Sequence, residues 1–165
     1  MIEQEINIKA TLQRLFTLIS RMGYECEVID KDELFVFTAS TTSLYGEDIT
    51  ININVTANGD NKHIGKGNYI AFEVFSPYNP TDKDDELQIS YYIMQLLTEV
   101  DLTTIQYVPQ TQQILISRVD CISPELSDHH IIQHIIKPVI NEFLHIFNII
   151  ESTPQNGYST PQYLN

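Results

Sequence analysis

The sequence of 165 residues has no tryptophan and only two cysteines. Cys26 and Cys121 lie 95 positions apart, and no CxxC motif is present. Small proteins that are held together by disulfides carry several cysteines, and they work in oxidising compartments. We therefore expect no disulfide framework, and we expect a protein of the reducing cytoplasm.

Basic residues are also scarce. Nine Lys and Arg face 22 Asp and Glu, which gives a formal net charge of −13 at pH 7. Binding to nucleic acid needs cations that replace the counterions of the phosphates, and adhesion to anionic lipid needs a basic patch. We therefore expect neither nucleic acid nor a membrane as partner, whereas a protein partner suits an acidic surface.

Long apolar runs are missing as well. No run reaches the roughly 18 residues that a membrane-spanning helix needs. The residues from Met1 to Glu5 contain neither the basic nor the apolar segment of a secretory signal. We therefore expect no transmembrane segment and no signal peptide.

The residues that are present describe a globular protein. Hydrophobic residues make up 42% of the chain and charged residues 19%, which is typical of a folded domain and not of a disordered one. Residues 152–165 hold two prolines, one glycine and no charge. We expect one domain over residues 1–151 and a disordered C-terminal tail over residues 152–165.

The apolar spacing predicts an alternation of helices and strands. Apolar residues from Ile6 to Met22 recur every three or four positions, and Gly23 is a natural helix stop. Between Asp48 and Thr56, apolar and polar residues alternate strictly, which indicates a strand with one buried and one wet face. The polar, glycine-bearing segment Ala57 to Gly67 is expected to be a loop.

The remaining elements follow from the same patterns. The predicted strands are Glu25–Asp30, Glu33–Thr38, Asp48–Thr56, Tyr69–Phe75, Thr103–Val108 and Gln113–Val119. A middle helix opens with the acidic run from Thr81 to Glu86 and continues to about Val100. The resulting order, α-β-β-β-β-α-β-β-α, predicts a two-layer α+β fold. We expect one antiparallel sheet with the first and last helices on the same face.

The last helix is expected to begin with Ser123 as N-cap and Pro124 at its first position, and to end near Ile150. Pro138 lies inside it and should remove one backbone hydrogen bond and bend the helix. Four histidines lie on this helix, at positions 129, 130, 134 and 145. Helical geometry places His130, His134 and His145 opposite the apolar face, so we interpret them as a solvated surface and not as a metal site.

Other motifs also fail to give a catalytic site. Glu142 and His145 form one ExxH motif, but a di-iron centre needs two such motifs and two further Glu. The segment from His63 to Asn68 has glycines near a lysine, but its spacing differs from that of a phosphate loop. Cys26 lies between Glu25 and Glu27, which disfavour its thiolate. We therefore predict no catalytic residue, no cofactor and no metal.

The middle helix carries two apolar stripes. The predicted core stripe consists of Ile89, Ile93, Leu96, Leu97 and Val100. A second stripe consists of Leu87, Tyr91, Met94 and Thr98. A helix that is apolar on two sides is either deeply buried or uses one side for a partner. We predict that the second stripe binds a protein partner or a second copy in a homodimer.

The order of elements resembles the type III secretion chaperone-like fold, and the chain is most similar to the YbjN-like family of bacterial proteins. The points of similarity are the helix ending at Gly23-Tyr24, the strand pair around Asp30 and Phe35–Phe37, the middle helix Glu86–Val100, the hairpin Ile105–Val119 and Ser123-Pro124-Glu125-Leu126. The resemblance spans about residues 6–150. It implies a small, acidic, often dimeric bacterial protein that binds proteins or influences regulation, and it implies no catalytic residues.

Three hypotheses about function follow. The first is a non-enzymatic, protein-binding domain that acts as a chaperone-like adaptor or regulator, with its acidic surface selecting partners. The second is a small-ligand-binding or enzymatic module with a pocket between the sheet and the long helix. The third is a structural subunit of a larger complex.

Overall fold

The computed structural model describes residues 2–30, 33–43, 45–61, 65–77 and 86–152. Three sequence-based predictions fall outside these ranges: the turn at Lys31-Asp32, the acidic helix start before residue 86, and the tail from residue 153 onward. The predicted boundary of the tail is wrong by one residue, because Ser152 is the last residue of the final helix.

The sheet has six strands, and every neighbouring pair is antiparallel, as predicted. The strands are β1 (Glu25–Asp30), β2 (Leu34–Thr42), β3 (Asp48–Asn61), β4 (Gly65–Pro77), β5 (Thr104–Val108) and β6 (Gln113–Cys121). Their spatial order is β1-β2-β3-β4-β6-β5, so β5 forms one edge and β6 lies inside. The first four strands are neighbours in sequence order because short connections favour adjacent antiparallel pairing.

One face of the sheet is the core face. The alternation that predicted β3 is confirmed, because Ile49, Ile51, Ile53 and Val55 are buried. The register places Phe37 opposite Ile53 and Phe35 opposite Val55, so large side chains of neighbouring strands lie side by side. Cross-strand neighbours of this kind are the unit that stabilises a sheet.

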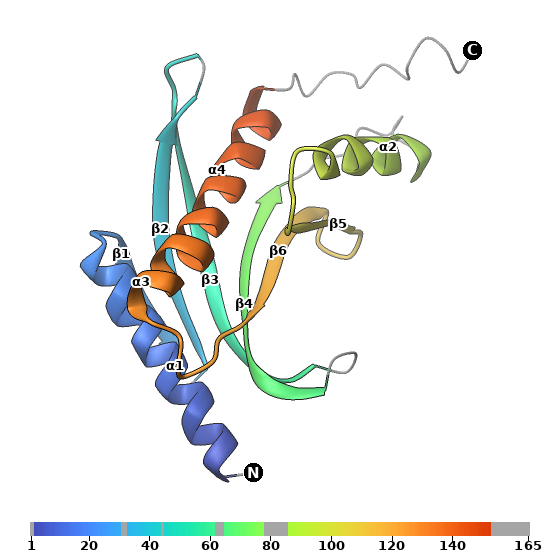
Figure 1. Cartoon of the computed structure of the whole chain (residues 1–165). Helices are drawn as coiled ribbons and strands as arrows, with labels where there is room; N and C mark the ends of the chain where they lie inside the picture. Colours follow the sequence, from blue (N-terminus) through green and yellow to red (C-terminus); the bar gives the residue numbers. More distant parts are fainter. Residues whose placement is uncertain (1, 31–32, 44, 62–64, 78–85, 153–165) are drawn as a thin grey trace.

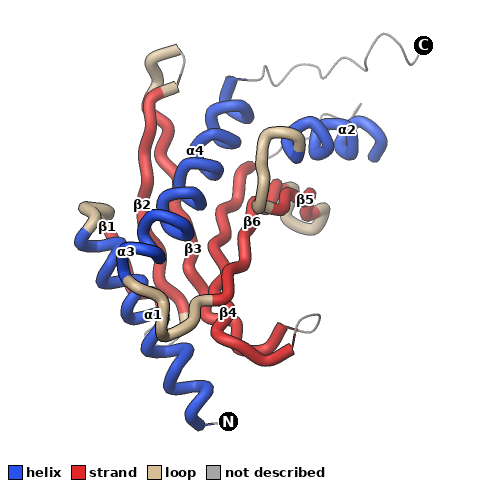
Figure 2. Tube along the Cα trace, viewed as in Figure 1, coloured by secondary structure: helices blue, strands red, loops and turns tan. Residues whose placement is uncertain are grey.

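The helical elements cover that same face (Figures 1 and 2). They are α1 (Ile2–Arg21), α2 (Glu86–Leu97), α3 (Asp128–Ile131), the π-helical segment η1 (Ile132–Ile136) and α4 (Lys137–Ser152). One core cluster contains Leu15 of α1, Leu96 of α2 and Phe143 of α4 together with the buried strand residues. The first and last helices therefore share one face of the sheet, as predicted.

The hairpin of β3 and β4 is longer than predicted. The prediction of a loop from Ala57 to Gly67 is wrong for residues 57–61 and 65–67, which belong to the two strands. The register pairs Asn58 with Tyr69 and Asn61 with Gly65. Strand propensity depends strongly on context, so polar composition alone misplaced the boundary.

The last helix begins later than predicted. Ser123 and Pro124 are not its N-terminal residues, because the N–H of Leu126 donates to the carbonyl of Ser123 in a turn. The helix begins at Asp128, and the hydroxyl of its N-cap Ser127 accepts the N–H of His130 at 3.2 Å. A serine N-cap satisfies a backbone donor that the helix leaves without a partner.

Pro138 affects this helix through a change of helix type. The turn that precedes it, Ile132–Ile136, is π-helical, and the N–H of Lys137 donates to the carbonyl of Ile132, five residues earlier. In an α-helix the proline ring clashes with the carbonyl four residues before it. A single π-type turn shifts the hydrogen-bond register at that point and lets the chain continue as α4.

Candidate functional site

The helix α2 is held in the fold by two side chains. Tyr92 and Leu96 are buried in the core cluster, and the half-buried Ile93 and Val100 pack against its edge. Ile89 is also half-buried. The predicted core stripe is thus wrong at Leu97, which is 40% exposed, and it omitted Tyr92. The side of α2 that faces the core is rotated about the helix axis from the predicted side. The reason is that α2 packs at the β5 edge of the sheet and not across its centre.

The opposite side of α2 is apolar and accessible. Leu87 is 58% exposed and Met94 is 60% exposed, and Tyr91 is half-buried beside them. The predicted second stripe therefore lies on the outside of the helix. We define the α2 surface as the set Leu87, Tyr91, Met94, Leu97 and Thr98.

The α2 surface has no charge of its own. All residues from Leu87 to Thr98 are uncharged, although the chain as a whole carries −13. Leu102, in the turn that follows α2, adds a further side chain that is 66% exposed. Large apolar side chains grouped on one helix without charge are typical of protein interaction sites.

Hydrogen bonds fix the end of α2 against α4. The Glu142 carboxylate on α4 accepts the backbone N–H of Asp101 at 3.0 Å, and it also accepts the hydroxyl of Thr103. His145, one turn later, lies 3.2 Å from the Glu99 carboxylate. The ExxH pair of α4 thus binds the turn after α2 and anchors the α2 surface.

The other predicted surface residues lie where helical geometry places them. His129, His130, His134 and His145 are all exposed. The rings of His130 and His134 are 4.6 Å apart. Among the described residues, no three His, Cys, Asp or Glu side chains gather closely enough to hold a metal ion.

The two cysteines differ in exposure. Cys26 is half-buried on the core-facing side of β1, and Cys121 is exposed at the end of β6. Burial raises the pKa of the Cys26 thiol, and a hydrogen bond with Ser20 offsets this rise in part. Desolvation is therefore the cause of the weak thiolate, and not the flanking glutamates that the sequence suggests.

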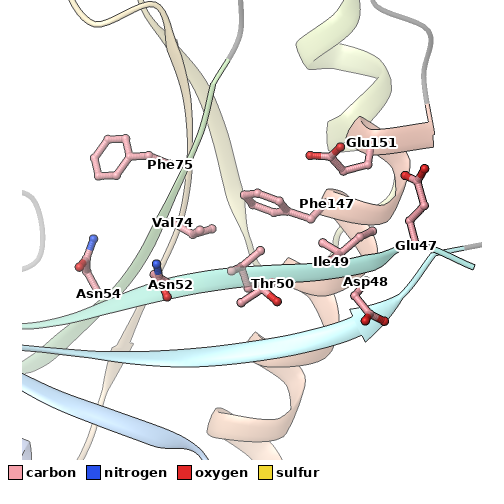
Figure 3. A pocket seen from close by; sticks show the side chains of 11 residues that line it. Glu47, Asp48, Ile49, Thr50, Asn52, Asn54, Val74, Phe75, Phe147 and Glu151 are labelled. Atoms are coloured by element: carbon pink, nitrogen blue, oxygen red, sulfur yellow. The ribbon is translucent and has the colours of Figure 1, made fainter.

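A cavity of about 510 Å³ lies between β3 and β4 at the end where α4 finishes (Figure 3). The register of the two strands runs from the Asn61–Gly65 pair to the Asn54–Glu73 pair, and within the described strands it goes no further. Beyond that point β3 follows β2, up to the pair of Thr42 with Asp48. The strand β4 follows β6 up to Pro77 instead. The strands thus separate and leave an opening in the sheet.

The lining of this opening is made by strand edges. Every residue from Glu47 to Asn52 contributes, as do the successive residues Val74 and Phe75. Successive side chains of a strand point to opposite faces, so a cavity that touches all of them runs along the strand's edge. Phe147 of α4 completes the lining on the core side, and the exposed Glu151, at the end of α4, lies at the rim.

Charge is distributed unevenly in the opening. Glu47, Asp48 and Glu151 contribute carboxylates, and none of the described residues that line the cavity is Lys, Arg or His. Figure 3 shows Glu47 and Glu151 at one end and Asn52 and Asn54 at the other. The Ser43 hydroxyl accepts the N–H of Glu47 at 3.1 Å, which fixes the turn that presents the acidic end.

Sequence reasoning did not find this opening. The alternation from Ile49 to Val55 continues unchanged past the point where β4 departs. Alternation identifies the buried face of a strand, but it does not show which neighbouring strand pairs with each of its edges.

Within the part of the chain that the structure describes, no helix has the length and apolar character needed to cross a membrane. No family model, no curated protein and no solved structure matches this chain.

Proposed function

We propose that this chain is a non-enzymatic, protein-binding domain of the chaperone-like adaptor or regulator type, and that the α2 surface is its binding surface. The observation that carries the proposal is the exposure of Leu87 and Met94 on one uncharged side of a helix. Burying such side chains contributes on the order of 1.5–3 kcal/mol each.

The first occupant that we propose for this surface is a second copy of the chain. A symmetric contact lets one patch cover itself on both copies. The uncharged segment from Leu87 to Thr98 makes this possible in a strongly acidic protein, because no like charges meet across the contact. Tyr91 fits such a contact, since its ring buries area while its hydroxyl stays at the rim.

The size of the surface sets the strength of the contact. The 12 residues of α2 form a helix about 18 Å long. One side of such a helix is smaller than the ~800 Å² per partner of a stable complex. We therefore propose a reversible dimer and not a permanent one.

The order of elements is also the order on which the YbjN-like resemblance rests. Together with the antiparallel sheet, this order supports a type III secretion chaperone-like fold. The cysteine usage, with no CxxC motif, supports a cytoplasmic location. The alternative of a small-ligand or enzymatic module receives less support. The opening beside α4 lies where that alternative expected a pocket. Among the described residues of its lining, however, Thr50 supplies the only hydroxyl and none is His, Cys or Lys.

Sedimentation velocity over a range of protein concentrations tests the proposal. The unmodified chain should show a reversible increase in sedimentation coefficient, whereas Met94→Glu and Tyr91→Glu should remain monomeric with an unchanged circular dichroism spectrum. Asn141→Glu is the matched control, because it adds the same charge to an exposed position of α4. A chain that stays monomeric at every concentration, or a control that dissociates equally, would contradict the proposal.

A further inference from the structure

The opening between β3 and β4 offers a second binding site, separate from the α2 surface. Its two edges are held rigidly and independently. The strand β3 is backed by β2 through nine residue pairs, and β4 is backed by β6 through nine pairs. Side-chain hydrogen bonds add to the pairing of β2 with β3. The Thr38 hydroxyl donates to Asn52 at 3.0 Å, and the Ser40 hydroxyl lies 3.1 Å from that of Thr50.

The edge of β3 is therefore preorganised for another strand. Residues 48–53 are already extended, and in the described chain β4 does not pair with them. An extended segment that pairs with an open strand edge gains main-chain hydrogen bonds and loses little entropy on the side of the receiving strand. Six residues of strand span about 20 Å, which fits a short peptide segment.

The surroundings define the chemistry of the occupant. On the core side, the opening is lined by Ile49, Ile51, Val74 and Phe147, all of them apolar and buried. At the rim, the carboxylates of Glu47, Asp48 and Glu151 have no basic neighbour in the lining. A strand that enters with one face toward Phe147 and the other toward solvent matches both environments when apolar and basic residues alternate along it.

We infer that the edge of β3 in this opening binds an extended peptide segment in which apolar side chains alternate with lysine or arginine. The segment adds to the sheet as a strand, with its apolar side on Phe147 and its cations near the acidic rim. This inference deepens the proposed protein-binding function but does not depend on the α2 surface, and substitutions in α2 leave the opening unchanged.

The probe for a binding test is a labelled, acetylated heptapeptide in which lysine or arginine alternates with valine. Fluorescence anisotropy should show saturable binding to the full chain. The same peptide with N-methyl groups on alternate amides should bind at least about tenfold more weakly, because it cannot form the ladder. Equal binding of the two peptides, or no binding of the first, would overturn the inference.

Two variants separate the acidic rim from the general charge of the protein. Glu151→Lys lies in the opening, and Glu125→Lys lies in the turn before α3, outside the cavity lining. Both residues are exposed, so both variants should fold and both change the net charge equally. We expect Glu151→Lys to weaken peptide binding about fivefold and Glu125→Lys to leave it nearly unchanged. If both variants weakened peptide binding equally, the loss would reflect only long-range attraction to the net charge of the protein. That result would overturn the assignment of the binding site to the opening.

Hydrogen exchange locates the peptide and excludes other occupants. Adding the peptide should slow exchange at amides within residues 48–53 and leave the amides of α2 unaffected. If the amides of residues 48–53 were protected before any peptide is added, and deletion of residues 153–165 removed that protection, the opening would be assigned to this chain's own C-terminal segment. Protection that rises with protein concentration would assign it to a second copy. Either result would overturn the inference of an external peptide, and neither would touch the proposal for α2.

Discussion

The guanidinium of Arg118 and the carboxylate of Asp120 form an ion pair on the core face of β6. Nε of Arg118 lies 2.8 Å from Oδ2 of Asp120, and Nη2 donates to Oδ1 at 3.1 Å. Only 4% of Arg118 is exposed, and its Nη1 has no hydrogen-bond partner among the described residues. Asp120 is therefore the main compensation for a buried charge.

Asp120→Ala should lower the free energy of unfolding by about 2–4 kcal/mol, because it leaves the buried guanidinium without its counter-charge. Urea denaturation followed by circular dichroism measures the change. The double variant Arg118→Met with Asp120→Ala is the control, since it removes both charges and should recover most of the loss. If Asp120→Ala were as stable as the unmodified chain, the ion pair with Asp120 would not be needed to stabilise the buried Arg118.

The start of the last helix can be tested by two serine substitutions. Ser127→Ala should destabilise the protein by about 1 kcal/mol, because the N–H of His130 loses its partner. Ser123→Ala, at the position that the sequence favoured, removes an acceptor for the N–H of Glu125 in an exposed turn and not at the helix start, so it should destabilise the protein less. Thermal unfolding of both variants gives the comparison, and the opposite ranking would place the N-cap at Ser123.

Glu142 is expected to control the mobility of the turn after α2. Glu142→Ala removes the acceptor for the Asp101 N–H and the Thr103 hydroxyl, so amide exchange around residues 99–103 should accelerate. The expected cost in stability is roughly 1–2 kcal/mol. Asn141→Ala, on the exposed neighbouring position, should leave exchange there unchanged. A turn that exchanges equally slowly in both variants would contradict the anchoring role.

The two thiols should react at different rates. Cys121 is exposed, whereas burial raises the pKa of Cys26, so Cys26 carries less thiolate at pH 8. Iodoacetamide should therefore alkylate Cys121 first, as mass spectrometry of digested samples can show. The raised pKa of Cys26 also implies that the stability of the fold declines as the pH rises through the ordinary range of a thiol, because the unfolded chain releases this proton more readily than the folded one. Faster alkylation of Cys26 would contradict the burial on β1.

The sheet could be predicted because its signal is local. The alternation of Ile49, Ile51 and Ile53 with polar residues fixes both the strand and its buried face. The same period also contains Arg118, which follows Ile114 and Ile116 at two-residue steps. The buried arginine was therefore indicated by the pattern, although its residue type argued for the surface.

The site was predictable only in part, for physical reasons. Leu87 and Met94 lie outside as expected, because helical angle alone places them away from Leu96. Leu97 was assigned to the wrong side because its angle lies between the two stripes, and contacts with β5 decide such positions. The opening between β3 and β4 depends on which strand each edge follows, which is a long-range property that no local pattern encodes.

Oxidation of Met94 tests the central claim most directly. In the full chain, peroxide oxidation of Met94 should proceed at the rate of an exposed thioether at low protein concentration, since Met94 is 60% exposed. We predict that its rate falls severalfold as the concentration is raised, and that Tyr91→Glu abolishes the fall. Met22, half-buried at the end of α1, is the internal reference and should not change. A rate of Met94 oxidation that is the same at every concentration would contradict the claim that a second copy covers the α2 surface.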